Sequence, residues 1–103
     1  MNLDQCVMAI IAFAGDSQSY SRQAIEAARN SRFDEAGAFI NEAKENALRS
    51  HQAHTELLTT SAANELQVNF LMVHASNHLS VAEMLITMAE LFIELSKRGK
   101  KNA

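Results

Sequence analysis

Apolar residues recur every three or four positions along almost the whole chain. This spacing puts them on one side of an α-helix, because a helix turns by about 100° per residue. The first such stripe predicts a long amphipathic helix over residues 3–29, whose middle, residues 15–22, is polar. Its apolar positions are Leu3, Val7, Ile10, Ala14, Ala24, Ile25 and Ala28.

A second stripe follows a short polar interruption. Residues 30–32, Asn-Ser-Arg, suit a helix end and a tight connection. The new stripe steps by three and four for four heptads, and its small residues allow a neighbouring helix to approach closely. It loses this order at residues 62–67, where we place the second connection. The stripe consists of Phe33, Ala36, Ile40, Ala43, Ala47, Ser50, His54, Leu57 and Ser61.

The third stripe is the most regular and predicts a heptad seam that contains two histidines. A second apolar line passes through Asn77 on an adjacent face, so this helix requires burial on more than one side. Gly99 follows two basic residues and predicts the helix end. The seam consists of Leu71, His74, His78, Val81, Leu85, Met88, Phe92 and Leu95, and the second line of Phe70, Val73, Met84 and Leu91.

The composition supports an all-α fold. The chain has no proline and 3 glycines, so it offers little turn chemistry for β-hairpins. Its 103 residues are enough for a single domain, residues 1–103. Three long helices of about 27–30 residues bury little surface on their own, so we expect several copies to form a larger helical bundle. Heptad spacing alone does not fix the number of copies.

The charge and the cysteine content indicate where the protein is located and which partners it can bind. The net charge of -3 provides no positive excess for binding nucleic acid. The longest apolar run, residues 6–14, is too short for membrane insertion. The single cysteine, Cys6, and the absence of a basic signal-peptide start predict a cytoplasmic protein. Cys6 has no basic neighbour, so we expect an inert thiol.

The histidines carry the main chemical signal. All four lie in the two later predicted helices, and three of them fall on positions predicted to face inward. His74 and His78 are four residues apart, so their rings lie one above the other. This pair suits metal binding, nucleophilic or acid–base catalysis, or a structural hydrogen bond. No glutamate follows the first histidine, which disfavours a zinc hydrolase. The four are His51, His54, His74 and His78.

Several segments resemble one known family. Residues 73–79, Val-His-Ala-Ser-Asn-His-Leu, are similar to its V-H-A-Q-D-H-L segment. Further similar stretches are Ala-Gly-Asp-Ser-Gln-Ser at 14–19, Phe-Asp-Glu-Ala at 33–36, His-Gln-Ala-His-Thr at 51–55 and Leu-Phe-Ile-Glu-Leu-Ser-Lys-Arg-Gly at 91–99. The family is the enzyme IIA component of the lactose/cellobiose (N,N'-diacetylchitobiose) class of the bacterial phosphoenolpyruvate-dependent sugar phosphotransferase system. The resemblance covers nearly the whole chain.

The resemblance implies a homotrimer of three-helix protomers that carries phosphate. The first histidine of the segment, His74, would accept a phosphoryl group on Nε2 from phospho-HPr and pass it to a cysteine of the cognate IIB protein. His78, one turn on, and His54 or His51 from the second helix would support the phosphate. The reaction implied needs no cofactor, and both partners would bind transiently.

Two departures from the family's pattern concern the site. The family's Asp, which binds a metal ion such as Mg²⁺ shared around the trimer axis, is Asn77 here. An amide lacks the negative charge that favours a buried cation. Neighbouring amides also do not repel one another as carboxylates do, so no cation is needed between them. We therefore hypothesise a metal-free trimer with Asn77 amides bonded around its axis. The family's Gln in the second helix is His54 and the Gln of the segment is Ser76, so the phosphate pocket is expected to use different donors.

Two other interpretations remain open from the residues. The first is a helical regulatory or interaction module that keeps the fold without transferring phosphate, as the changed positions would allow. The second is a histidine-rich metal-binding bundle, which would need ligands beyond His74 and His78. The sugar is also open among lactose, cellobiose and chitobiose, because the carrier implied by the resemblance never contacts sugar.

Overall fold

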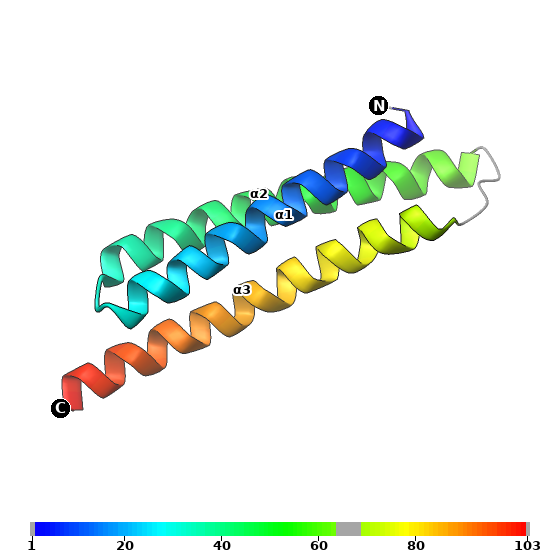
Figure 1. Cartoon of the computed structure of the whole chain (residues 1–103). Helices are drawn as coiled ribbons and strands as arrows, with labels where there is room; N and C mark the ends of the chain where they lie inside the picture. Colours follow the sequence, from blue (N-terminus) through cyan, green and yellow to red (C-terminus); the bar gives the residue numbers. More distant parts are fainter. Residues whose placement is uncertain (1, 64–68, 103) are drawn as a thin grey trace.

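The computed structural model describes residues 2–63 and 69–102, which form three long α-helices without a strand (Figure 1). α1 spans Leu3–Arg29, α2 spans Phe33–Ala63 and α3 spans Phe70–Asn102. The all-α prediction and the connection at residues 30–32 are confirmed. Residues 64–67 of the second predicted connection lie outside the described residues. Within those residues, no helix combines the length and apolar content needed to span a bilayer.

Local hydrogen bonds define both ends of α1. Asn2 Oδ1 accepts from the Gln5 amide at 2.8 Å, and Gln5 Oε1 accepts from the Asn2 amide at 3.0 Å, which forms a capping box. At the other end, Ser31 adopts the left-handed conformation with φ 62°, and the Arg32 amide donates to the Ala27 carbonyl at 2.8 Å. These bonds satisfy terminal groups that the helix itself leaves free, so α1 ends where the sequence predicts.

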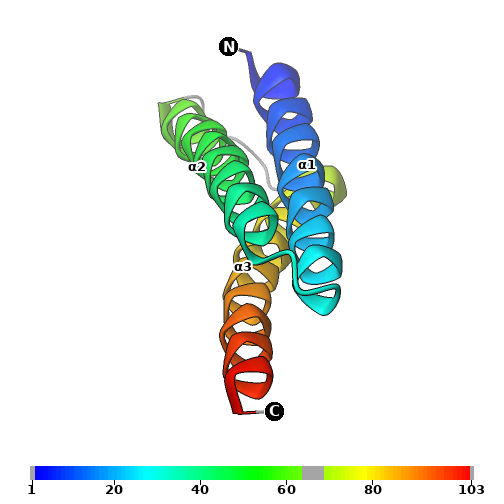
Figure 2. The ribbon, with the colours of Figure 1, turned by 90° about the vertical axis from the view of Figure 1, so that its left-hand side faces the viewer.

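The three helices form a rod of 58 × 17 × 16 Å. α1 and α3 run in the same direction and α2 runs in the opposite one (Figure 1). α1 packs against both other helices, whereas α2 and α3 diverge and touch far less (Figure 2). The side of α3 that faces away from α1 and α2 is therefore left uncovered within one copy of the chain.

Small residues line the contact between α1 and α2. Ser17 Oγ in α1 donates to the Ala43 carbonyl at 2.8 Å, and Ser50 Oγ in α2 donates to the Ile10 carbonyl at 2.8 Å. All four residues are buried. The polar middle of the first stripe is thus part of the core, because its buried hydroxyl finds a backbone acceptor on the neighbouring helix.

The buried side of α3 differs from the predicted seam. The seam's positions are exposed or half-buried, with Val81 53% and Leu95 55% exposed. Within one copy, α3 packs on α1 and α2 through another side, where three alanines alternate with four larger apolar residues. The buried positions are Met72, Ala75, Leu79, Ala82, Ile86, Ala89 and Ile93.

The end of α3 also differs from the prediction. The helix continues past Gly99 to Asn102. No glycine among the described residues has a positive φ, so Gly99 does not terminate the helix. An ion pair between Arg98 and Glu94 at 2.6 Å, one turn apart, contributes to the stability of this last part.

Candidate functional site

His74 and His78 contact each other on adjacent turns near the start of α3. Nε2 of His78 lies 3.1 Å from Nε2 of His74. The ring centroids are 4.5 Å apart and the ring planes stand at 84°. This contact is a hydrogen bond only when one Nε2 carries hydrogen and the other does not. The pair can therefore present an unprotonated ring nitrogen beside an N–H donor.

A buried side chain of α1 fixes the backbone at this pair. Gln18 Nε2 donates to the carbonyl oxygen of His78 at 3.1 Å. Inside a helix this oxygen already accepts the amide four residues further on, so the Gln18 bond is an additional one. It links α1 to α3 at the level of the histidine pair and therefore restricts how α3 can slide or rotate there.

His54 lies on the other flank of α3. Its Nε2 is 3.0 Å from Ser76 Oγ, and this bond links α2 to α3. Ser76 follows His74 by two residues, so their side chains point about 200° apart on the helix. Among the described residues, no hydrogen bond joins the His54–Ser76 pair to the His74–His78 pair.

The exposure of the histidines corrects one prediction. His74 and His51 are exposed, while His78 and His54 are half-buried. The prediction that three histidines face inward was therefore wrong, because they flank the core rather than lie in it. His51 lines a separate hollow together with Lys44 and Glu83. Exposure of His74 leaves its ring accessible to a second protein.

Asn77 lies on the outer side of α3. It precedes the buried Leu79 by two residues, which places the two side chains about 200° apart. Asn77 is exposed and lines a shallow hollow that also includes His54, Val73 and Ser76.

The groups near Asn77 do not fit the divalent ion that the family resemblance implies. In the part of α3 before Glu83 there is no acidic residue. In residues 2–63 and 69–102, no group of three or more His, Cys, Asp or Glu side chains is placed to hold a metal. Mg²⁺ and Ca²⁺ are held mainly by charged carboxylates, whereas an amide supplies only a neutral oxygen. That the reaction needs no cofactor stays a prediction.

Cys6 of α1 is buried in the hydrophobic core between the helices, with 0% of its surface exposed. Burial raises the pKa of its thiol above the ordinary value of 9.0, and the nearby carboxylate of Glu56 raises this pKa further. A thiol held in its protonated form is a poor nucleophile. Burial and the raised pKa both favour the inert role predicted for Cys6.

Two contacts of the site were not predicted from the sequence. The bond from Gln18 to His78 has a signal in hindsight, because Gln18 falls one turn after Ala14 on the buried stripe of α1. A polar residue at a core position needs a partner on a neighbouring helix. The bond between His54 and Ser76 has no such signal, because serine is common on exposed helix faces as well.

The geometry suits nucleophilic chemistry at an exposed imidazole. An unprotonated ring nitrogen is a competent nucleophile near neutral pH, and an adjacent N–H can stabilise negative charge on the group that it receives.

Comparison with known proteins identifies the family. Residues 5–97 match the family described as PTS system, Lactose/Cellobiose specific IIA subunit. The chain belongs to this family. It is 36% identical over 91 residues to the lactose-specific EIIA component of Staphylococcus epidermidis, with 87% of this chain and 88% of that protein covered.

Solved IIA structures share the fold. The crystal structure of the cellobiose-specific enzyme IIA from Bacillus anthracis superposes with a TM-score of 0.92 at 27% identity, covering 100% of this chain and 95% of that one. The IIA(chitobiose)–HPr complex of Escherichia coli gives a TM-score of 0.86 at 25% identity, covering 97% and 98%. The family membership and these likenesses support a phosphocarrier role.

Proposed function

We propose that this protein is a phosphohistidine carrier of a sugar phosphotransferase system, with His74 as the acceptor. The observation that supports this most is the contact between Nε2 of His74 and Nε2 of His78 on an exposed part of α3. The donor is phospho-HPr, consistent with the HPr complex of the chitobiose IIA neighbour. The acceptor downstream is a cysteine of a cognate IIB protein, and the exchange takes place in the cytoplasm.

The reaction is a direct transfer between two nucleophiles. The lone pair of His74 Nε2 attacks phosphorus, and the bond from phosphorus to the HPr histidine breaks with its electron pair returning to that ring. In the second step the thiolate of the IIB cysteine attacks phosphorus, and the bond to His74 Nε2 breaks. Catalysis of this kind rests on positioning and on stabilisation of the phosphoryl oxygens.

His78 acts as a positioning residue and a donor. Before transfer, its Nε2–H donates to the lone pair of His74 Nε2 and keeps that ring in the reactive tautomer. This hydrogen bond breaks as the lone pair attacks phosphorus. After transfer, the lone pair is used in the new bond, so the same N–H becomes free to donate to a phosphoryl oxygen. The bond from Gln18 to the His78 backbone holds the turn in place during this exchange.

The outer face of α3 supports association between copies of the chain, and the family resemblance supplies the number three. This face carries large exposed apolar side chains along its length, and a soluble monomer rarely leaves so long an apolar surface uncovered. We propose that it is the surface through which three copies associate.

Such an assembly also gives His54 a role. In a ring of copies, one flank of each α3 faces the opposite flank of the next. The flank of His54 and Ser76 then faces the flank of a neighbouring copy's His74 and His78. We propose that His54 supports the phosphate across this boundary. His51 stands further along α2 beside Lys44 and has the weaker claim to such a role.

The experiment that tests the relay uses labelled phosphate. The chain is mixed with enzyme I, HPr and phosphoenolpyruvate, and a IIB protein with a reactive cysteine is added afterwards. We expect label to enter the chain and then move to IIB. The second candidate function, a regulatory module favoured by the changed residues His54, Ser76 and Asn77, predicts binding to HPr without label in the chain.

A further inference from the structure

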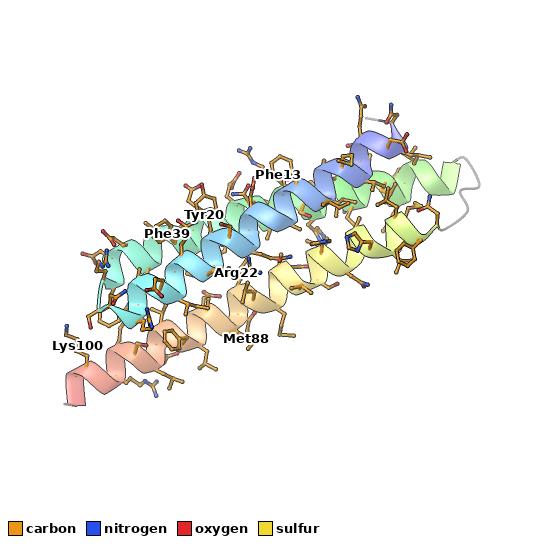
Figure 3. All side chains as sticks on the ribbon, viewed as in Figure 1. Phe13, Tyr20, Arg22, Phe39, Met88 and Lys100 are labelled. Carbon is orange, nitrogen blue, oxygen red and sulfur yellow. The ribbon has the colours of Figure 1, made fainter. Side chains whose placement is uncertain are left out.

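The outer face of α3 repeats with the spacing of a heptad seam. Its residues step by four and three along the helix, and most of them are apolar and exposed. Figure 3 shows Met88, one of them, projecting away from α1 and α2. We call this surface the α3 outer face. It consists of Phe70, Asn77, Val81, Met84, Met88, Leu91 and Leu95, with His74 at one edge, about 60° around the helix from Asn77.

Further copies of this chain fit the α3 outer face. None of its positions is Lys, Arg, Asp or Glu, so two such faces can meet without like-charge repulsion. A heptad stripe is complementary to another heptad stripe, because both helices bend into one supercoil that keeps the stripes in contact. At about 1.5 Å per residue, the stripe runs for roughly 37 Å, most of the length of the rod.

Asn77 is a neutral polar residue within this apolar stripe. A buried amide must be hydrogen-bonded, and one amide carries both N–H donors and an oxygen acceptor. We propose that the Asn77 side chains of the assembled copies bond to one another in a closed ring, and that the assembly therefore needs no divalent cation. This inference rests on the proposed homotrimer and replaces the metal site that the family resemblance implies.

The hydrogen-bonded ring of Asn77 side chains needs no other group to complete it. In a cyclic assembly every copy is equivalent, so each Asn77 can donate to the next and accept from the previous one. A hard cation such as Mg²⁺ on the axis would meet amide oxygens, apolar side chains and at most imidazole nitrogens but no carboxylate, since the nearest acidic residue on α3, Glu83, lies on a different side of the helix.

The first test compares the assembly of the wild-type chain with and without divalent ions. Its mass in solution is measured by light scattering in EDTA and in Mg²⁺, and the metal content of the purified protein is measured by mass spectrometry. We expect the same oligomer in both buffers and no stoichiometric metal. Dissociation in EDTA, a metal bound at one ion per assembly, or a monomer in both buffers would overturn the proposal.

A pair of matched variants tests the role of the amide. Asn77→Asp brings carboxylates together on the axis, so we expect an at least tenfold weaker assembly in EDTA that Mg²⁺ restores. Asn41→Asp makes the same change at an exposed position of α2 and should assemble like the wild type. Helicity by circular dichroism checks the fold of both. Unchanged assembly of a folded Asn77→Asp variant in EDTA would contradict the ring.

The experiments distinguish failure of the amide ring from failure of the proposed carrier function. Phosphate uptake at His74 is measured on the same samples. A chain that takes up phosphate but assembles only with a metal leaves the carrier function intact and overturns the amide ring. A metal-independent oligomer without phosphate uptake keeps the amide ring and contradicts the carrier function.

Discussion

Nε2 of His78 lies 3.1 Å from Nε2 of His74, one turn away on the same helix. The two rings stand nearly perpendicular, at 84°, so the ring edge of one meets the other. When one Nε2 donates its hydrogen to the other, the accepting Nε2 carries no hydrogen of its own. The relationship thus links the tautomer of the proposed nucleophile to that of its neighbour.

Replacing His78 should slow phosphate uptake without abolishing it. His78→Phe keeps a planar ring but removes the N–H that orients His74 and later bonds to phosphate, and a hydrogen bond to a charged group contributes about 1.5–3 kcal/mol. We therefore expect uptake to be roughly ten- to a hundredfold slower. Rapid-quench kinetics with labelled HPr measures the rate. Leu48→Phe, at a 51% exposed position of α2, serves as the control and should react at nearly the wild-type rate.

A charge on the α3 outer face should weaken the assembly. Met88 is 58% exposed on that face, and Met88→Glu would place a carboxylate where apolar side chains of several copies meet. We expect a lower average mass at micromolar concentration. Met8 on α1 is 60% exposed, so Met8→Glu is a matched control that should leave the mass unchanged. Equal masses for the two variants would argue against this interface.

Cys6 should resist thiol reagents in the folded protein. Its thiol is buried, and its pKa is raised, chiefly by that burial. The rate of reaction with a chromogenic disulfide should be low at pH 8 and rise by orders of magnitude when the chain is unfolded in guanidinium. Rapid labelling under native conditions would show that the N-terminal part of α1 opens.

The Cys6 thiol also makes the free energy of unfolding depend on pH. Because the pKa of Cys6 is higher in the folded chain than in the unfolded one, the unfolded state loses its proton first as pH rises. Stability is therefore unaffected below the ordinary pKa of 9.0 and decreases above it. Cys6→Ser should reduce this alkaline loss, as urea unfolding at several pH values would show.

Truncating the buried side chain of Ile10 should lower the free energy of unfolding far more than truncating an exposed side chain of α1. Ile10 has 0% of its surface exposed, and Ile10→Ala leaves a cavity that typically costs about 2–5 kcal/mol of unfolding free energy. Met8→Ala removes a side chain of similar size from the surface and should change it by no more than about 0.5 kcal/mol. Urea unfolding of both variants tests the difference.

The sequence predicts the helices better than the side of α3 that is buried. Stripes of Leu, Val, Ile and Ala fix α1 and α2, and Asn30 with Ser31 marks the turn between them. On α3 large apolar residues lie on both sides, Leu79 and Ile86 inside and Met84 and Met88 outside, so side-chain size alone does not show which side is buried within one copy. An apolar face that serves other copies and one that serves the protomer look alike in a single sequence.

Part of the candidate site is visible from spacing, and part depends on packing. Two histidines four residues apart must share a helix face, so the His74–His78 contact follows from the sequence. The bond of His54 to Ser76 depends on how far α2 diverges from α3, which the stripes do not determine. For this reason the sequence does not predict which flank of α3 His54 contacts.

The most direct measurement is the intact mass of the chain after incubation with phosphoenolpyruvate, enzyme I and HPr. For the wild type we predict a gain of one phosphoryl group that is lost in acid, as a phosphohistidine is. His74→Gln, folded by circular dichroism, should show no gain, while His78→Phe should still gain the group more slowly. A wild-type chain without the gain, in a mixture that labels a known IIA protein, or a His74→Gln variant with it, would contradict the account.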